Sequence, residues 1–174
     1  LLERLHGDLP PVQQYLDSLD DVIAQLGDRK LIASFVDLGK YGTGHQLYIP
    51  WMQATYVMAA NRKALPYLPK GADLNALTYA QLAQWGKAIQ DATGERRLGF
   101  PAGPKGLIHR FFQGYLYPSY TGGVVRTFKS ADAVSMWSEF RELWKTVNPR
   151  STSYDFMQEP LLAGEVWVAF DHTA

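Results

Sequence analysis

Apolar residues recur at helical spacing near the start of the chain. Between Pro10 and Leu26 they are three or four residues apart, at Val12, Tyr15, Leu16, Leu19, Ile23 and Leu26. This spacing predicts a helix over that range, because residues three and four apart share one helix face. Asp28 is a suitable N-cap for a second helix, which would carry Leu31, Ile32, Phe35 and Val36. We therefore expect two short helices in this part of the chain.

The middle of the chain gives the clearest start and stop signals. Thr78-Tyr79-Ala80-Gln81 is a capping box, the pattern in which the first and last side chains bind each other's backbone N–H groups. The helix that follows would end at Gly94 and present one apolar face, formed by Leu82, Trp85, Ile89 and Ala92. A short apolar run from Arg97 to Pro101, bounded by Gly and Pro, then predicts a buried strand.

The last third of the chain predicts more helices and a final strand. Leu107 to Tyr117 is an aromatic-rich helical stretch, and Ser130 can cap another helix. We assign the apolar stripe of that second helix to core packing; it comprises Val134, Trp137, Phe140, Trp144 and Val147. Ser151 to Ala163 is helical but interrupted by Pro160, and Val166 to Phe170 predicts a strand that ends on Asp171-His172-Thr173.

The order of these elements predicts the fold class. Helices alternate with strands, which is typical of an α/β layered fold. In open sheets of this kind, ligands bind beyond the carboxyl ends of the strands. Asp171 and His172 occupy such an end.

The stretch from Tyr48 to Arg62 has an unusual pattern. His45 to Ile49 reads as the beginning of a strand, but Pro50 lacks a backbone donor, so pairing cannot continue through it. This pattern predicts a strand that leaves one sheet and joins another, with a hinge from Pro50 to Thr55. In an extended chain, Trp51 and Gln53 would point the same way. A flat apolar ring beside an amide suits a sugar.

The composition limits the classes of partner that this chain could bind. The chain has 174 residues, 17 basic and 17 acidic, so its formal net charge is zero and it lacks the positive field that nucleic acid or an anionic membrane attracts. It has no cysteine, which excludes disulfides and thiolate metal sites. We see no membrane-spanning run and no leader pattern at Leu1, so we expect a removed signal or a piece of a longer protein.

Several segments together resemble one family. These are Tyr48 to Leu65, Leu98 to Gly103, Phe111 to Tyr117 and Glu159 to His172, in this order and spacing. They are similar to the extracellular solute-binding proteins of bacterial ABC sugar transporters, the maltose-binding-protein-like family. The resemblance implies a periplasmic-binding-protein-like type II fold, with two α/β lobes around a ligand cleft. It also implies that residues 1–53 are part of the first lobe and its crossover strand, and that residues 54–174 are an incomplete second lobe.

The resemblance also points to binding residues. His6-Gly7-Asp8 resembles a first-lobe binding loop, although Asp8 could equally cap a helix. Trp51 and Gln53 would contact ligand from the crossover, the alternatives being a core aromatic and an amide that binds backbone. The second-lobe candidates are Asp171, His172 and Arg110. The alternatives are that Asp171 caps a helix, that His172 is an ordinary surface histidine, and that Arg110 belongs to an exposed basic helix face.

The function implied by the resemblance is to bind a sugar or oligosaccharide and deliver it to an ABC transporter permease. The protein would be periplasmic or extracellular, or a lipoprotein anchored at the cell surface. The resemblance implies no cofactor, no metal, no nucleic-acid partner and no direct membrane insertion of this chain. Two alternatives are a carbohydrate-active enzyme and a protein-interaction module that uses the aromatic excess. Catalysis is disfavoured because no motif organises the nearby acids Asp155, Glu159, Glu165 and Asp171 into a pair, and the histidines at 6, 45, 109 and 172 are scattered.

Overall fold

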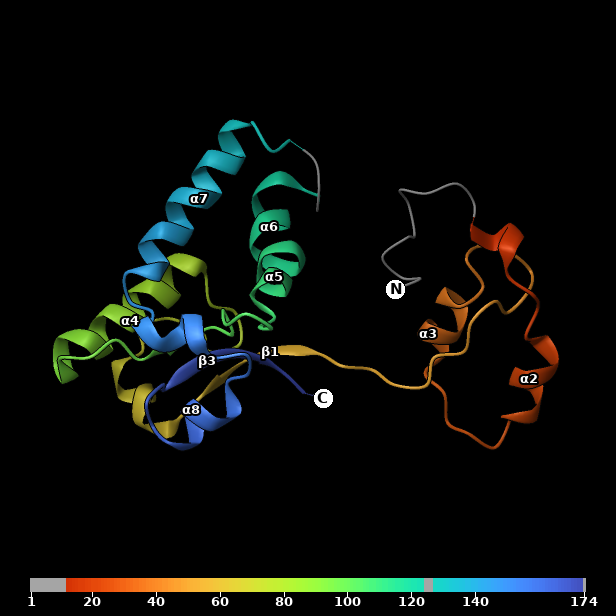
Figure 1. The fold of residues 1–174 in the computed structure, drawn as a ribbon, viewed down its shortest axis with the longest axis horizontal. Coiled ribbons are helices and arrows are strands. Elements are labelled where there is room, and N and C mark those ends of the chain that lie inside the picture. The colour runs from red at the N-terminus through yellow and green to blue at the C-terminus, as the bar shows by residue number, and fades with distance from the viewer. Residues whose placement is uncertain (1–11, 124–126, 174) are drawn as a thin grey trace. The chain divides into compact units, whose positions relative to one another are not determined.

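The chain folds into two compact units, which we describe separately. The computed structural model describes residues 12–123 and 127–173. Unit 1 is Leu1–Ala54 and unit 2 is Thr55–Ala174. Figure 1 shows both, with unit 1 in red to orange and unit 2 running from yellow to blue.

The described residues of unit 1 form three short helical elements. They are η1 (Val12–Tyr15), α2 (Asp20–Gln25) and α3 (Ala33–Leu38). The single helix expected up to Leu26 is therefore wrong. The chain breaks before α2 because the backbone N–H of Leu19 donates to the carbonyl of Gln46, 2.7 Å away, and not to a helical carbonyl. The second helix begins at Ala33, later than a cap at Asp28 would place it.

A buried glutamine holds unit 1 together. The Gln46 side chain is 1% exposed, and its amide donates to the carbonyls of Val36 and Tyr48 at 3.0 and 2.6 Å. Gly39 lies directly beside this amide, and a Cβ there would overlap it and the Tyr48 carbonyl. Only a glycine fits at this close approach. Among the described residues of unit 1, only Gly39, Gln46 and Leu47 are buried, so polar contacts contribute much of its order.

Asp20 links α2 to the segment that contains Gln46. Its Oδ1 accepts the Gln46 N–H at 2.7 Å, and its Oδ2 lies 2.7 Å from Nδ1 of His45. The Gln46 hydrogen bond and then that of His45 lower the pKa of Asp20 from 3.8 to about 2.

We expect this pair of contacts to make unit 1 sensitive to acid. A lowered pKa means that the Asp20 contribution to stability is complete above pH 3.8 and is lost as the pH falls towards 2. Nuclear magnetic resonance titration of the Asp20 carboxyl carbon should show a midpoint near 2, and Asp20→Asn should reduce the acid sensitivity of α2. A midpoint at 3.8 or above would contradict this assignment.

The crossover region differs from the expectation. Residues 46–55 have no strand assignment, so the predicted strand from His45 to Ile49 is wrong. Residues 12–54 include no strand with which it could pair, and the N–H groups of Leu47 and Tyr48 both donate to the Gly39 carbonyl. The strand of this region begins at Tyr56.

Unit 2 is built on a three-stranded sheet with the order β1-β3-β2. The strands are β1 (Tyr56–Ala60), β2 (Leu98–Gly99) and the central β3 (Val168–His172). β1 pairs antiparallel with β3, with Tyr56 opposite His172, and β2 pairs parallel with it. Beyond the ladder, the N–H of Thr55 donates to the Thr173 hydroxyl at 3.1 Å and the N–H of Thr173 donates to the Thr55 carbonyl at 3.0 Å.

The helices of unit 2 lie around this sheet (Figure 1). The predicted capping box is confirmed: α4 (Tyr79–Thr93) has both reciprocal hydrogen bonds between Thr78 and Gln81, and it ends at the left-handed Gly94. Its inward residues include Leu82, Trp85 and Ile89, whereas Ala92 is exposed. A continuous helical stretch follows, formed by α5 (Ile108–Phe111), the π-helix η3 (Phe112–Leu116) and α6 (Tyr117–Thr121).

The helix α7 (Ala131–Trp144) is capped by Ser130, as predicted, but it is rotated from the expected orientation. Its buried residues are Ala133, Met136 and Leu143, and Val147 is buried beyond its end. Trp137 is 54% exposed and Val134 64%, so their assignment to the core is wrong. Phe140 and Trp144 are only partly buried against the core. The residues 133, 136, 140, 143 and 147 form an equally periodic stripe, and this is the stripe that faces the core.

Shorter elements complete unit 2. These are η2 (Arg62–Tyr67), η4 (Pro149–Ser153) and α8 (Gln158–Leu162). Pro160 does not interrupt α8, contrary to the expectation. It lies in the first turn, where a backbone N–H would have no partner within the helix, so the proline costs no hydrogen bond.

The core of unit 2 requires close contact between α4 and the sheet. A Cβ added to Gly86 would lie 2.6 Å from both Leu98 Cδ1 and Thr146 Oγ1. We expect Gly86→Ala to destabilise the protein by about 1–3 kcal/mol, because the core must shift to admit a methyl group. Urea denaturation would measure this, with Gly114→Ala as the control, since Gly114 faces open space. Equal effects of the two substitutions would contradict the prediction.

Candidate functional site

Three segments of unit 2 meet at one edge of the sheet. β2 and β3 are parallel, so their carboxyl ends lie at the same edge, and the antiparallel β1 brings its first residue there. Asp171 and His172 end β3, and Tyr56 begins β1 opposite His172. The segment from Phe100 to Leu107 follows β2 at the same edge. This is the place where α/β sheets bind ligands.

Aromatic side chains cover this edge. The Tyr56 ring stacks on Phe170, with centroids 5.4 Å apart and planes inclined by 4°. Tyr115 presents its edge to both rings, at 6.4 and 5.7 Å. His172 contacts Tyr56 at 6.2 Å and Phe156 at 6.0 Å, both edge to face. We call these five residues the aromatic edge; Phe156 is 52% and Tyr115 39% exposed, so both present ring surface to solvent.

The buried Asp171 carboxylate binds the backbone next to two residues of the aromatic edge. Its side chain is 7% exposed, and its oxygens accept the N–H groups of Met157 and His172, each at 2.9 Å. These hydrogen bonds fix the backbone on both sides of the Phe156–His172 contact. The geometry is that of a residue that positions its neighbours, with little carboxylate surface left for a ligand.

A second carboxylate fixes the loop that follows β2. Asp155 Oδ1 accepts the N–H of Lys105 at 2.9 Å, and the N–H of Gly103 donates to the Tyr154 carbonyl at 2.8 Å. Phe156 therefore lies between two residues whose positions are set by carboxylate–backbone hydrogen bonds. Because these bonds hold the chain on either side, the exposed ring loses little conformational freedom when it binds something.

The π-helix η3 affects where Tyr115 projects. A π turn contains more residues than an α turn, so it changes the direction of the side chains that follow it, and such turns are frequent at functional sites. Here the wide turn spans Phe112–Leu116 and carries Tyr115 against Tyr56 and Phe170. Arg110 lies one turn earlier on α5; it is partly buried, and its Nε has no hydrogen-bond partner among the described residues.

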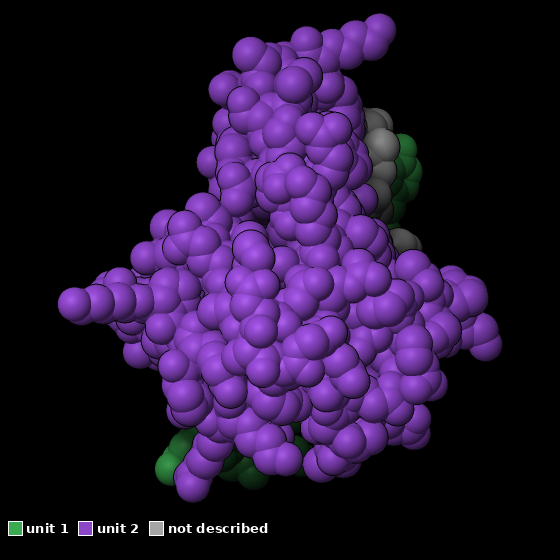
Figure 2. Space-filling view, turned by 90° about the vertical axis from the view of Figure 1, so that its left-hand side faces the viewer, with its two compact units in different colours: residues 1–54 green, residues 55–174 purple. Residues whose placement is uncertain are grey.

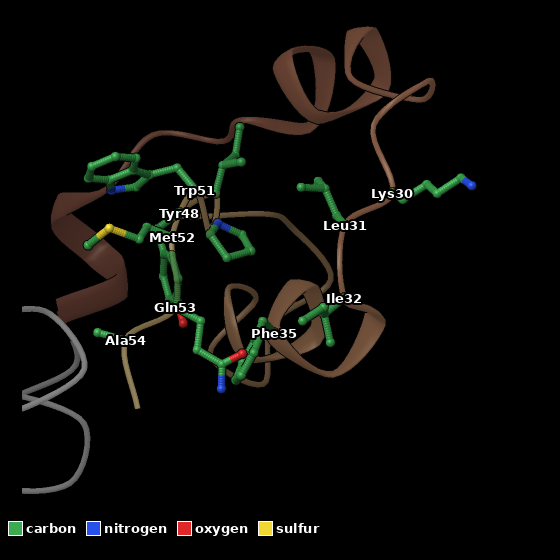
Figure 3. A pocket seen from close by; sticks show the side chains of 11 residues that line it. Lys30, Leu31, Ile32, Phe35, Tyr48, Trp51, Met52, Gln53 and Ala54 are labelled. Atoms are coloured by element: carbon green, nitrogen blue, oxygen red, sulfur yellow. The ribbon is translucent and has the colours of Figure 1, made fainter. Parts of the chain in front are cut away.

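Unit 1 has an open pocket of about 670 Å³ that includes Trp51 and Gln53. Its other walls are mainly apolar and come from α3, the segment before it and residues 48–54 (Figure 3). Trp51 is 86% exposed. Figure 3 shows that the side chains of Trp51 and Gln53 do not point the same way, as an extended strand would require. The reason is that this segment is not part of a strand.

The structure thus brings some of the predicted site residues together. Asp171 and His172 lie at the aromatic edge, and Trp51 and Gln53 line one pocket of unit 1. His6 and Asp8 fall outside the described residues. Their roles, and that of Arg110, stay predictions.

Sequence reasoning missed Tyr56, Tyr115 and Phe156. Tyr56 belongs to the very stretch that drew attention to the crossover, and Tyr115 to the aromatic run after Phe111. For Phe156 no local pattern pointed to the sheet edge, because its position depends on hydrogen bonds to Asp171 and to the loop after β2.

No group of three or more His, Cys, Asp or Glu residues within the described ranges is arranged to hold a metal ion. Across the same ranges, no helix has the length and apolar character needed to span a bilayer.

Comparisons with known proteins agree with these features. A family model described as bacterial extracellular solute-binding protein matches residues 3–174. No curated protein sequence matches the chain.

Solved structures that share the fold include the following two. The maltose-bound MalE3 of T. maritima has a TM-score of 0.66 at 19% identity, with 92% of this chain and 43% of that chain covered. A probable secreted solute-binding lipoprotein from Streptomyces coelicolor has a TM-score of 0.60 at 17% identity, with 91% and 42% covered. The chain thus spans less than half the length of either protein. Both are type II periplasmic-binding proteins, which confirms the predicted α/β fold class. Since the family model matches almost the whole sequence, this chain belongs to the bacterial extracellular solute-binding protein family.

Proposed function

We propose that the protein containing this chain binds a sugar or oligosaccharide and delivers it to an ABC transporter permease. The observation that carries the proposal is the aromatic edge at the carboxyl end of β3, in a chain of the solute-binding family. Exposed rings held by hydrogen bonds can stack on the apolar faces of pyranose rings. The maltose bound to the structural neighbour from T. maritima supports a carbohydrate as the solute.

Residues of both units have roles in this proposal. In unit 2, Tyr115, Phe156 and His172 contact the sugar, Asp171 positions two of them, and Arg110 donates hydrogen bonds to hydroxyl groups. In unit 1, Trp51 is a stacking platform and Gln53 hydrogen-bonds hydroxyl groups. His6 and Asp8 would complete the polar contacts of the first lobe, with Asp8 accepting from two adjacent hydroxyls.

The proposed mechanism is closure of two lobes on the ligand. In this proposal, unit 1 is the part of the first lobe and unit 2 the part of the second lobe that the resemblance implies. Residues 50–54 have no strand assignment, so rotation about their backbone bonds would break no hydrogen bonds between strands. A ligand that touches both walls only in the closed form stabilises that form and shifts the population towards it.

A binding role is favoured over catalysis. The acids at the aromatic edge, Asp155 and Asp171, each accept backbone N–H groups. A glycosidase would need a pair of carboxyl groups exposed to the substrate at a defined separation. The proposal therefore includes no turnover, no cofactor and no metal, and it places the protein in the periplasm or outside the cell.

Isothermal titration calorimetry of the full-length protein with a panel of mono- and oligosaccharides tests the proposal. We expect saturable binding of at least one sugar, without hydrolysis when the products are analysed by chromatography. Binding of amino acids or peptides but of no sugar would overturn the carbohydrate assignment. Release of shorter sugars that stops in an Asp or Glu variant would favour the enzyme alternative.

A further inference from the structure

The outer face of α7 carries large apolar side chains. Trp137 and Val134 are exposed, and Phe140 and Trp144 are partly buried. With Arg96, Arg141 and Lys145 they line an open groove of about 680 Å³, here called the α7 groove. Figure 2 shows unit 2 from the side on which α4 and α7 lie in Figure 1. The groove contains none of the aromatic edge residues, so it is separate from the proposed solute site.

The rings of the α7 groove pack against one another and against Phe112 of η3. Phe112 lies 5.2 Å from Trp137 and 4.4 Å from Phe140, and Phe140 lies 5.3 Å from Trp144, all as centroid distances. Such contacts restrict the side chains before binding and so reduce the entropy lost on binding. Trp137 and Trp144 are two helical turns apart, about 10 Å along the axis. Two anchor points at that separation match residues i and i+7 of a second helix.

The rim of the α7 groove is cationic. Arg96 and Arg141 form no ion pair with any residue in the described ranges, whereas Lys145 pairs with Glu142 at 2.7 Å. Glu139 lies on a different side of α7, near Tyr120 of α6. Burial raises the pKa of Tyr120 most, and the negative charge of Glu139 raises it further. Glu142 also interacts with the charge of Arg141, but neither Arg96 nor Arg141 has a carboxylate within ion-pair distance in the described part of unit 2.

We propose that the α7 groove binds an acidic amphipathic helix of a partner protein. Trp and Arg are the residues that most often carry binding energy at protein interfaces, and here both kinds meet on one face. The apolar stripe of the partner helix packs between Trp137 and Trp144, and its carboxylates reach Arg96 and Arg141, with which they form charge-assisted hydrogen bonds. Complementary charge also orients the helix and speeds its association.

A fluorescent synthetic peptide tests this on the full-length protein. The peptide is a 16-residue helix with leucines at i, i+3 and i+7 and flanking glutamates. A control peptide has lysines in place of the glutamates. We expect anisotropy to report salt-sensitive binding of the glutamate peptide, at least tenfold tighter than the lysine peptide. Trp137→Ala and Arg141→Glu should each weaken it about tenfold or more. Leu162→Ala, at a side chain 89% exposed outside the groove, and Arg62→Glu should leave it unchanged.

Other outcomes would overturn the proposal. Equal binding of the two peptides would remove the charge recognition. Concentration-dependent dimerisation in sedimentation, lost in Trp137→Ala, would make a second copy the occupant. If iodide quenches the tryptophan fluorescence of the wild type no more than that of the Trp137→Phe variant, another part of the full-length protein covers the groove. Tighter binding of an anionic polysaccharide, lost in both groove variants, would assign the groove to a carbohydrate.

Discussion

Trp85→Ala is expected to destabilise the protein by about 3–5 kcal/mol, the usual range for truncating a buried tryptophan. Trp85 is 1% exposed on the inner face of α4, in the core cluster of unit 2. Its indole N–H also donates to the Ala64 carbonyl at 2.8 Å in a buried environment. Truncation therefore leaves both a cavity and a carbonyl without its partner, and each of these costs free energy.

Urea denaturation followed by far-ultraviolet circular dichroism measures this loss. Trp137→Ala is the matched control, since the same side chain is removed from a position that is 54% exposed. We expect the control to lose no more than about 1 kcal/mol. Similar losses for the two variants would mean that α4 and α7 are oriented differently from the structure described above.

Trp51→Ala is expected to weaken sugar binding by one to two powers of ten, equivalent to about 1–3 kcal/mol, the range for an aromatic anchor in a concave site. Stability should change little, because Trp51 is 86% exposed and contributes little to packing in unit 1. Calorimetry on the full-length protein measures the affinity. Trp51→Phe should recover part of it, since a smaller ring still stacks.

Tyr15→Ala is a suitable control for Trp51. It removes another highly exposed aromatic, 77% exposed, from unit 1, and Tyr15 does not line the pocket that contains Trp51. We expect its sugar affinity to equal that of the wild type. If Trp51→Ala keeps every affinity intact, or unfolds the protein, then Trp51 packs in a core and the first wall of the cleft lies elsewhere.

Local signals in the sequence predicted the elements that local interactions determine. The Thr78 capping box, the Ser130 cap and the stop at Gly94 are written in consecutive residues, and all were confirmed. Rotation of α7 could not be read in this way, because two stripes of similar periodicity run along it. The choice between them depends on which stripe lets α7 approach α4 and α6, and that is a tertiary property.

The same distinction between local and long-range interactions applies to the candidate site. The sequence predicted that Asp171 and His172 lie at the end of a strand, since an apolar run precedes them. The burial of the Asp171 carboxylate and the exposure of Phe156 were not visible, because they arise from hydrogen bonds between residues far apart along the chain. The crossover was misjudged for a related reason: strand propensity before Pro50 has no effect without a neighbouring strand, and residues 12–54 supply none.

The two hydrogen bonds between Thr55 and Thr173, here called the clasp, have a mechanical consequence for unit 2. It places Thr55 and Thr173 side by side, at the open end of the antiparallel β1–β3 pair. In such a pair the hydrogen bonds run across the strands, so tension applied through these two residues pulls along the bonds. The bonds then bear the load one after another, starting at the clasp, and do not share it. A pull applied at Thr55 and Thr173 would therefore peel β1 from β3 at low force.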